Sequence, residues 1–371
     1  MINEKRVLER FLEYVQIDSP TKEELNFANF LKVEMIRLGL EVYMDDAGEK
    51  VGSNSGNLVG RLKANGEGET ILFSSHMDTV SPSRGIKPQI KDGVIYSDGT
   101  TILGGDDKAG IAAIMEALEI IKESNMAHGE IEVAFTIFEE GGLFGAKNLD
   151  YSKLNAKKAF VMDSGGAPGV IIVQGPAQNK IDAKFIGKEA HAGVEPEKGI
   201  SAIQMASEAI SKMHLLRIDN ETTANIGSIS GGSVTNIVTK EVEIKAEARS
   251  LENSKLEKQT NHMVKCCQDA AEKFGGKVEL SVENVYGAFK INDNHVLVKS
   301  VKQACENLGF HAETRTSGGG SDTNILNING IEAINLGIGG SNHHTLEESI
   351  KIIDLENAAR LALEIIKVHA K

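Results

Sequence analysis

The chain has 371 residues, of which 25% are charged and 41% hydrophobic, an ordinary composition for a folded protein that is long enough for two domains. Its formal net charge of -13 excludes the basic surface that nucleic acid and anionic membranes require. No apolar run approaches the roughly 20 residues of a membrane span, and the charged start resembles no signal or transit peptide. Three cysteines, two of them adjacent, form neither a disulfide framework nor a CxxC zinc site, so we expect a cytoplasmic protein.

Helices and strands alternate along the first part of the chain. Apolar residues at helical spacing predict one helix within residues 21–38 and a second that begins at Lys108. Continuous apolar runs predict strands buried on both faces, and these lie at residues 57–62, 70–74, 131–138 and 158–162. This order predicts an α/β fold with a mostly parallel sheet flanked by helices and with any site at the carboxyl ends of the strands.

The pattern changes near Gln178. Residues 178–287 give the order strand, helix, strand, strand, helix, strand, which is typical of a ferredoxin-like α+β sandwich. The first pattern then resumes with a helix over 295–308, a strand over 331–336 and a closing helix capped by Asp354. We therefore predict two domains, with these boundaries: 1–177 and 288–371 for the sheet domain, and 178–287 for an inserted lid.

The motif SSHMDTV places His76 and Asp78 two residues apart at a predicted strand end, so both side chains point to one face. If His76 binds a metal through one ring nitrogen, Asp78 can hold the other nitrogen and fix the tautomer. The alternative is a polar strand terminus without a ligand.

The motif GGDDKAG places Asp106 and Asp107 directly before a helix. An N-cap role explains one aspartate but not two. The preceding glycines indicate a backbone that lies close to another group, which a metal-bridging carboxylate would explain. The motif is no phosphate loop, because no GK[ST] follows.

Three further motifs contribute acidic or imidazole side chains near strand ends. In FEEGG, Glu139 and Glu140 would point in opposite directions, so that one can bind metal while the other serves as a general base; a solvated acidic loop is the alternative. Asp163 ends the strand in MDSGG, and GGSNHHTLEES offers His343 or His344. Together these motifs predict a hydrolase that activates water between two divalent metal ions.

Eight motifs in this order carry a family resemblance over essentially the whole chain: SSHMDTV, GGDDKAG, EEGG, MDSGG, GKEAHAG, GGSVTNIV, GGGSD and HHTLEES. The chain resembles the di-zinc exopeptidases typified by peptidase T, glutamate carboxypeptidase and succinyl-diaminopimelate desuccinylase, and its doubled aspartate resembles peptidase T most. The resemblance implies two Zn²⁺ ions, although cobalt or manganese also suits such ligands. Its ligand set would be His76 and Asp163 for one ion, Glu140 and His344 for the other, and Asp106 as the bridge.

The same resemblance assigns further roles. Glu139 would be the general base, and a cis peptide would join Asp106 to Asp107. His344 is favoured over His343 because a glutamate follows it by four positions and a hydrophobic residue by six.

The inserted domain also matches the family. The motif GKEAHAG by itself predicts that His191 is a surface residue. The resemblance implies instead that His191 stabilises the developing oxyanion. Asn236 and Arg249 resemble lid positions that contact substrate, and the loop around Gly319 could present backbone N–H groups to a substrate carboxylate. Some relatives pair subunits through this domain, so the resemblance allows a homodimer, whereas a free-standing lid would give the same sequence pattern.

The predicted substrate is a short peptide, with an aminopeptidase acting on tripeptides as the first reading. The alternative with the same metal centre is an amidohydrolase that removes acyl groups from amino acids, or a dipeptidase. A non-catalytic metal-binding protein is disfavoured because Glu139 and every proposed ligand are present. A nucleotide-binding transferase is weaker still, because the glycine-rich segments lack a Walker or GxGxxG context.

Overall fold

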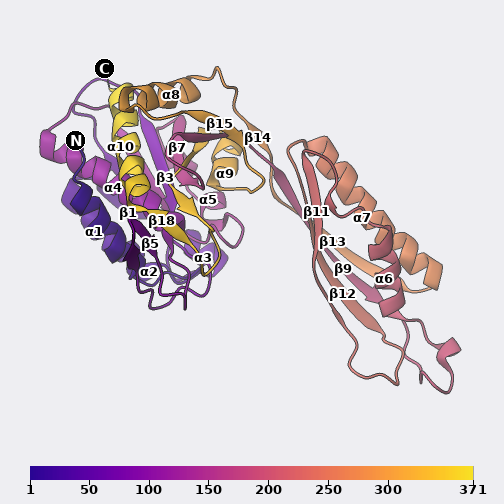
Figure 1. Cartoon of the computed structure of the whole chain (residues 1–371). Coiled ribbons are helices and arrows are strands. Elements are labelled where there is room, and N and C mark those ends of the chain that lie inside the picture. Colours follow the sequence, from indigo (N-terminus) through magenta and orange to yellow (C-terminus); the bar gives the residue numbers. More distant parts are fainter. Residues whose placement is uncertain (371) are drawn as a thin grey trace. The chain divides into compact units, whose positions relative to one another are not determined.

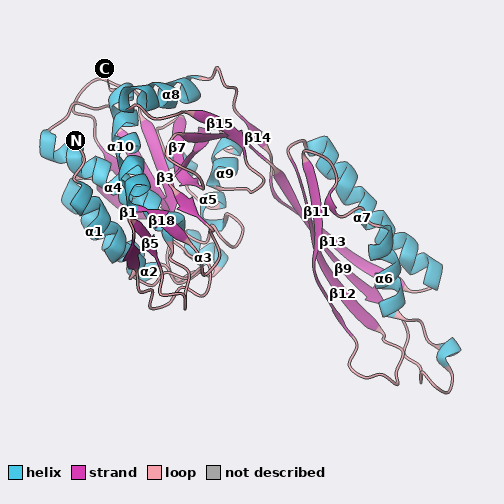
Figure 2. Cartoon of the chain, in the orientation of Figure 1, coloured by secondary structure: helices cyan, strands magenta, loops and turns pink. Residues whose placement is uncertain are grey.

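The computed structural model describes residues 1–370, which form two compact units. Unit 1 contains Met1–Val173, Lys290–Thr316 and the chain from Ser321 onward, and unit 2 contains Gln174–Phe289 with Ser317–Gly320. The sequence placed the boundaries at 178 and 287 and did not anticipate that Ser317–Gly320 would group with unit 2. Figure 1 gives the element labels and Figure 2 distinguishes helices from strands.

Unit 1 is built on one large sheet with the order β1-β2-β6-β3-β7-β16-β8-β14, and β15 pairs with β8. Its four central strands are parallel: β6 (Ile131–Thr136), β3 (Ile71–His76), β7 (Lys158–Ser164) and β16 (Glu332–Gly337). The flanking strands are β1 (Glu41–Met44), β2 (Leu58–Leu62), β8 (Val170–Gly175), β14 (Phe289–Lys290) and β15 (Glu313–Thr316). Strand β1 pairs with β2, β2 with β6, and β8 with β16, and all three pairs are antiparallel. The predicted α/β class is confirmed, with antiparallel strands added toward the edges.

Helices cover both faces of this sheet. The larger core includes side chains of β3, β6 and α4 (Gly105–Ser124), and four more helices complete that layer: α1 (Glu4–Val15), α2 (Leu25–Leu38), α8 (Val296–Leu308) and α10 (Ile352–His369). A smaller core on the other face includes Leu72, Val161 and Leu326, and Leu326 belongs to α9 (Asp322–Ile328). Two short helices, α3 (Ala47–Val51) and α5 (Phe144–Lys147), contact each other, and Ala47 of α3 is part of the larger core. α4 is buried over nearly its whole length, and its residues 109–115 are all small or apolar, as such burial requires.

Two details of unit 1 differ from expectation. The predicted cap Asp354 is wrong: the N-cap of α10 is Lys351, and Asp354 lies in the first turn, where its charge still favours the helix dipole. The second detail is a small separate sheet, whose strands are β17 (Gly340–Ser341), β18 (Ser349–Lys351), β5 (Val94–Tyr96) and β4 (Gln89–Lys91). The loop between β17 and β18 carries both candidate histidines.

Unit 2 has one antiparallel sheet with the order β10-β11-β12-β9-β13. In chain order its elements are β9 (Ala177–Ile186), α6 (Ala202–Lys212), β10 (Leu216–Arg217), β11 (Thr222–Gly231), β12 (Glu241–Ser250), α7 (Asn253–Phe274) and β13 (Lys277–Tyr286). The long strands and two helices follow the predicted ferredoxin-like order. The apolar core lies between the helices and one sheet face.

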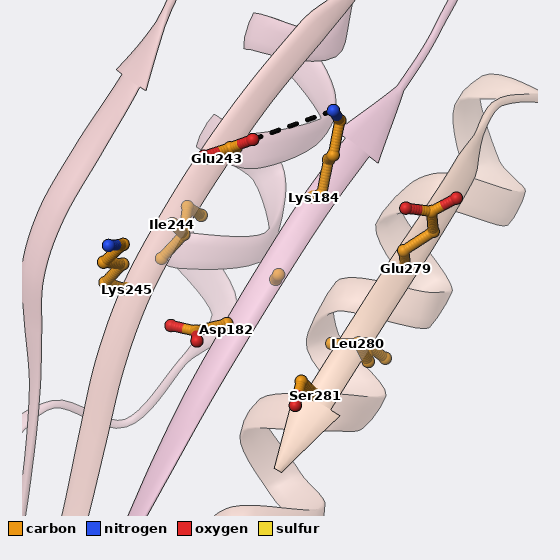
Figure 3. A pocket seen from close by; sticks show the side chains of 9 residues that line it. Asp182, Lys184, Glu243, Ile244, Lys245, Glu279, Leu280 and Ser281 are labelled. Carbon is orange, nitrogen blue, oxygen red and sulfur yellow. Dashed lines mark ion pairs between the residues drawn. The ribbon is translucent and has the colours of Figure 1, made fainter. Parts of the chain in front are cut away.

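The other face of the unit 2 sheet is charged and open. A shallow pocket of about 300 Å³ lies on it, lined by side chains such as Lys184, Glu243 and Glu279, and Lys184 pairs with Glu243 there (Figure 3). None of the predicted site residues lines this pocket. Among residues 1–370, no helix is long and apolar enough to cross a membrane.

Candidate metal centre

Asp106 lies at the start of α4, and each of its two carboxylate oxygens faces a different histidine. Its Oδ1 is 3.1 Å from His76 Nε2, and its Oδ2 is 3.3 Å from His344 Nε2. Asp163 joins the first set, with Oδ1 3.5 Å from His76 Nε2, and Glu140 joins the second, with Oε1 3.0 Å from His344 Nε2. Two sets of nitrogen and oxygen donors therefore share one aspartate.

These spacings fit two divalent cations. Ligand bonds of about 2.1 Å in tetrahedral geometry place two donors of one ion about 3.4 Å apart, close to the distances around Asp106. Among residues 1–370, no group donates a hydrogen bond of good geometry to the buried Glu140 Oε1, although His344 Nε2 lies 3.0 Å away. Two donors that face each other without hydrogen-bond alignment are typical of ligands arranged around a cation.

The electrostatics of the cluster also require positive charge. Burial opposes the charged form of His76, yet the carboxylates of Asp106 and Asp163 raise its pKa well above the usual value. Burial also opposes the charged form of Asp106 and would raise its pKa. Hydrogen bonds from His343, His344 and His76 nevertheless hold that pKa well below its usual range. So many carboxylates in one buried place are stable only beside cations or bound protons.

Asp107 is a further carboxylate that the sequence did not nominate as a ligand. His76, Asp107 and Asp163 offer donor atoms within 4.8 Å of one another, as do His76, Asp106 and Glu140. The Oδ2 of Asp107, however, accepts hydrogen bonds from the Ser75 hydroxyl and from the His76 N–H. The peptide bond between Asp106 and Asp107 is cis, as the resemblance predicted.

Both candidate histidines reach the cluster, so the structure does not separate them by proximity alone. His343 Nδ1 lies 3.0 Å from Asp106 Oδ2, while its Nε2 is buried without a partner. His344 contacts both Asp106 and Glu140. Of the two histidines, only His344 therefore lies beside both the shared aspartate and a second carboxylate.

Asp78 contacts His76 differently from the prediction. The ring Nδ1 of His76 is 2.9 Å from the main-chain oxygen of Asp78 and 3.5 Å from its carboxylate. That carboxylate accepts the N–H groups of Glu139 at 2.8 Å and Glu140 at 3.3 Å, and the hydroxyl of Thr21 at 2.8 Å. Asp78 thus orients two parts of the site: the imidazole of His76, and the turn that carries Glu139 and Glu140.

Glu348 fixes the loop before Asp106. Its carboxylate accepts the N–H groups of Leu103 and Gly104 at 2.8 Å and of Asp106 at 2.9 Å. Farther along the same motif, Gly110 is required because a Cβ there would lie 2.0 Å from the main-chain oxygen of Met162. The sequence used Glu348 only to set the histidine register and did not predict its structural role.

Asp322 is a buried acid that sequence reasoning missed, because the motif GGGSD was read for its glycines. Its Oδ2 accepts the Thr136 hydroxyl at 2.5 Å, and its Oδ1 has no partner. Burial raises the pKa of Asp322 to about 7. The sequence signal that could have identified Asp322 as a site residue is its position just after a glycine-rich turn.

His191 and Asn236 come together in unit 2. The main-chain N–H of Ala192 donates to the oxygen of Asn236 at 2.9 Å, and His191 forms a bridge with Ile237. The Gly193 N–H donates to His191 Nδ1 at 3.2 Å, so the neutral ring carries its proton on Nε2. The exposed His191 side chain therefore offers a hydrogen-bond donor.

Arg249 and Gly319 lie at the opposite end of the unit 2 sheet. Asn236 precedes β12 whereas Arg249 is near its end, and ten residues of strand span about 30 Å. Arg249 Nε donates to Glu247 at 3.0 Å, and the N–H of Gly319 is already donated to Ser317 Oγ at 3.0 Å. The four predicted substrate-contact residues therefore form two separate groups.

The chain is similar to known proteins along most of its length. Residues 72–368 match the model of Peptidase family M20/M25/M40. The chain belongs to this peptidase family. Membership confirms the predicted resemblance and identifies the chain as an enzyme, a metallo-exopeptidase.

Several relatives of this M20 peptidase cover its whole length. It is 49% identical to the protein YqjE of Bacillus subtilis over 100% of both chains, and 27% identical to peptidase T of Brevibacillus brevis over 98% of each. Among solved structures, aminopeptidase PepT from Bacillus cereus has a TM-score of 0.92 at 47% identity, covering 100% of both chains. A tripeptidase from Staphylococcus aureus has a TM-score of 0.96 at 46% identity, covering 99% of both.

Proposed function

We propose that this peptidase is an aminopeptidase that removes the first residue of short peptides, with tripeptides as the preferred class. The observation that carries the proposal is the shared Asp106, whose two oxygens face two separate donor sets. Support for the substrate class comes from the solved relatives named as an aminopeptidase and a tripeptidase, at 47% and 46% identity.

In this proposal, His76 and Asp163 would hold one Zn²⁺ and Glu140 and His344 would hold a second, with Asp106 shared by the two donor sets. Imidazole and carboxylate donors of this kind also accept cobalt or manganese. When bound, such a pair supplies Lewis acidity that lowers the pKa of water and polarises a carbonyl group.

Glu139 is the proposed general base. Burial raises the pKa of its carboxyl well above the usual value, and the negative charges of Asp163 and Glu140 add to this against the effect of His76. A carboxylate of increased basicity can take a proton from the attacking water and return it to the leaving amine. Its main-chain N–H is held by Asp78 at 2.8 Å, which sets the position from which it acts.

Unit 2 supplies the proposed substrate contacts. His191 would donate its Nε2 proton to the developing oxyanion, with Asn236 beside it. Arg249 and the loop at Gly319 lie about 30 Å farther along the sheet, so one chain would supply only one of the two groups to a tripeptide of about 10 Å, and the second subunit of the dimer proposed below would supply the other. We also propose a homodimer formed through unit 2 and a cytoplasmic location. The three free cysteines are consistent with a reducing compartment.

The direct test compares Ala-Ala-Ala with its N-acetyl derivative and with Ala-Ala on the metal-loaded protein. Release of the first alanine from the free tripeptide, with the acetylated peptide uncleaved, is the expected result. Preference for the acetylated substrate would instead indicate a deacylase, and preference for Ala-Ala a dipeptidase. Glu139→Ala, assayed in parallel, excludes a contaminating peptidase.

A further inference from the structure

Phe138, the residue directly before Glu139, has a left-handed backbone with φ of 49°. A bulky side chain rarely adopts this conformation, so something must hold it. The Phe138 N–H donates to Oε1 of Glu24 at 3.1 Å. The same oxygen accepts the N–H of Lys22 at 2.9 Å, and Lys22 is also left-handed, with φ of 76°. One carboxylate oxygen therefore holds two unfavourable conformations in segments far apart along the chain.

Glu24 is well suited to hold a backbone rigidly. Its exposed fraction is 0%, and its second oxygen accepts the Ser53 hydroxyl at 2.6 Å. Burial raises the pKa of this carboxyl, although the hydrogen bond from Ser53 opposes the shift. A buried carboxylate with every oxygen engaged makes well-defined contacts, because each lost hydrogen bond would leave a polar group unsatisfied.

The ring of Phe138 is also fixed in place. The Lys22 ammonium lies 4.9 Å from the ring centroid, and a Cβ on Gly141 would lie 1.7 Å from a ring atom. Beyond it, the main-chain oxygen of Glu139 accepts the N–H groups of Gly142 at 2.9 Å and Leu143 at 2.7 Å. Little freedom remains in the turn once the Phe138 backbone is set.

The neighbouring residue Thr21 reaches the same turn by a second route. Its hydroxyl donates to Asp78 at 2.8 Å, and Asp78 accepts the N–H of Glu139 at 2.8 Å. The segment from Thr21 to Glu24 is therefore linked to two consecutive residues of the turn, to Phe138 directly and to Glu139 through Asp78. Thr21 acts through a carboxylate that already contacts Glu139, whereas Glu24 acts on the residue before it.

We propose that Glu24 is a positioning residue for Glu139. By fixing the backbone of Phe138 it determines where the Glu139 carboxyl lies, and it touches no reacting atom itself. This inference rests on the proposed function, in which Glu139 is the general base. Removal of the Glu24 carboxylate should therefore lower kcat without weakening substrate binding or metal binding.

The experiment compares Glu24→Ala and Glu24→Gln with the matched variants Glu132→Ala and Glu132→Gln. Glu132 is also buried, at 1% exposure, and its carboxylate accepts the N–H groups of Asn155 and Ala156 at 3.0 Å. It lies near the first residues of β6, whereas the Glu139 turn follows the last. The control therefore removes a buried carboxylate that also holds main-chain N–H groups, at the opposite end of the strand, together with its ion pair to Arg61 at 2.9 Å.

We expect Glu24→Ala to lower kcat about 10 to 100-fold on Ala-Ala-Ala, with KM within about twofold and both metals retained. Glu24→Gln should stay within about threefold of the parent, because an amide oxygen can accept both N–H groups. Glu132→Ala should keep the parental kcat. If circular dichroism shows that Glu24→Ala is unfolded, Glu24→Asp replaces it with the same expected loss, since the oxygen is withdrawn by one methylene.

Two results would overturn the inference alone: parental kcat in the Glu24→Ala variant, or equal losses in the Glu24 and Glu132 alanine variants. A parent protein that cleaves none of the three test substrates would instead contradict the proposed function, and the inference with it. Assaying the parent first separates the two failures.

Discussion

The predicted metal ligands of unit 1 and the predicted substrate contacts of unit 2 differ in how firmly they are held. In unit 1, His76 and Asp106 are 2% and 7% exposed, and buried carboxylates fix the surrounding backbone. His344 is the exception among the predicted ligands, because its side chain is exposed on the loop between β17 and β18. In unit 2, His191 and Asn236 lie exposed on loops. Metal binding needs donor positions accurate to a fraction of an ångström. We infer that the buried groups of unit 1 fix the donor positions, whereas the exposed groups of unit 2 keep more conformational freedom.

The largest expected effect tests the chemical side of this comparison. Replacing Glu139 by Ala should lower kcat by about 100 to 10,000-fold, because a general base is lost. Metal analysis should still find two ions per chain. A variant with parental activity, or one that has lost its metals, would contradict the role of Glu139 as a base.

A second pair of variants sharpens the picture within unit 1. His344→Ala should lose one metal ion and reduce kcat more than about 100-fold, which exceeds the usual effect of removing an outer partner. His343→Ala should keep both ions, since His343 contacts Asp106 but not Glu140. Steady-state kinetics and metal analysis of both variants test this prediction. Loss of an ion in His343→Ala but not in His344→Ala would show that His343 is the ligand instead.

The third prediction tests unit 2. His191→Ala should reduce kcat about 100-fold through the loss of an oxyanion donor, without changing metal content. His214→Ala is the matched control, because His214 is another exposed imidazole of the same unit. Equal kcat for the two variants would remove His191 from the mechanism.

Asp78 is expected to have a smaller effect. Asp78→Ala should lower kcat about 10 to 100-fold, because the N–H groups of Glu139 and Glu140 lose their common acceptor. The protein should remain folded by circular dichroism. Unchanged kcat would show that the turn keeps its geometry without this carboxylate.

The smallest effect concerns the scaffold of unit 1. A hydrogen bond from Arg37 lowers the pKa of Glu119 to about 2 against the effect of burial, with the charges of Arg37 and Arg10 adding to it. The folded pKa lies below the unfolded value of about 4.3, so this stabilisation is present above pH of about 4.3 and is lost as the pH falls toward about 2. Because Arg37 is half exposed, we expect a contribution of about 1 kcal/mol.

Urea unfolding at pH 6 and pH 3 measures this contribution. The decrease in the free energy of unfolding between the two pH values should be smaller in Glu119→Gln than in the parent. An identical decrease in both proteins would show that Glu119 contributes nothing to acid sensitivity.

The sequence predicted much of the fold because hydrophobic periodicity reports local structure directly. The central strands, the inserted sandwich and the cluster of His76, Asp106, Glu140 and Asp163 all follow from patterns within short motifs. The resemblance supplied what periodicity does not, namely the cis bond after Asp106.

The missed features share a different physical origin. Glu24, Asp322 and Glu348 act through hydrogen bonds between segments that are far apart in the sequence, and each looks like an ordinary acid in its own motif. Asp354 was misassigned as a cap because a helix can carry an acid anywhere in its first turn. The separation of His191 from Arg249 follows from strand length and register, which the motifs do not show.

The measurement that tests the central claim most directly is anomalous X-ray scattering from crystals of the zinc-loaded protein. We predict two peaks, one beside His76 and Asp163 and one beside Glu140 and His344, with one oxygen of Asp106 bound to each. A single peak, or a pair of peaks that Asp106 does not join, would contradict the account.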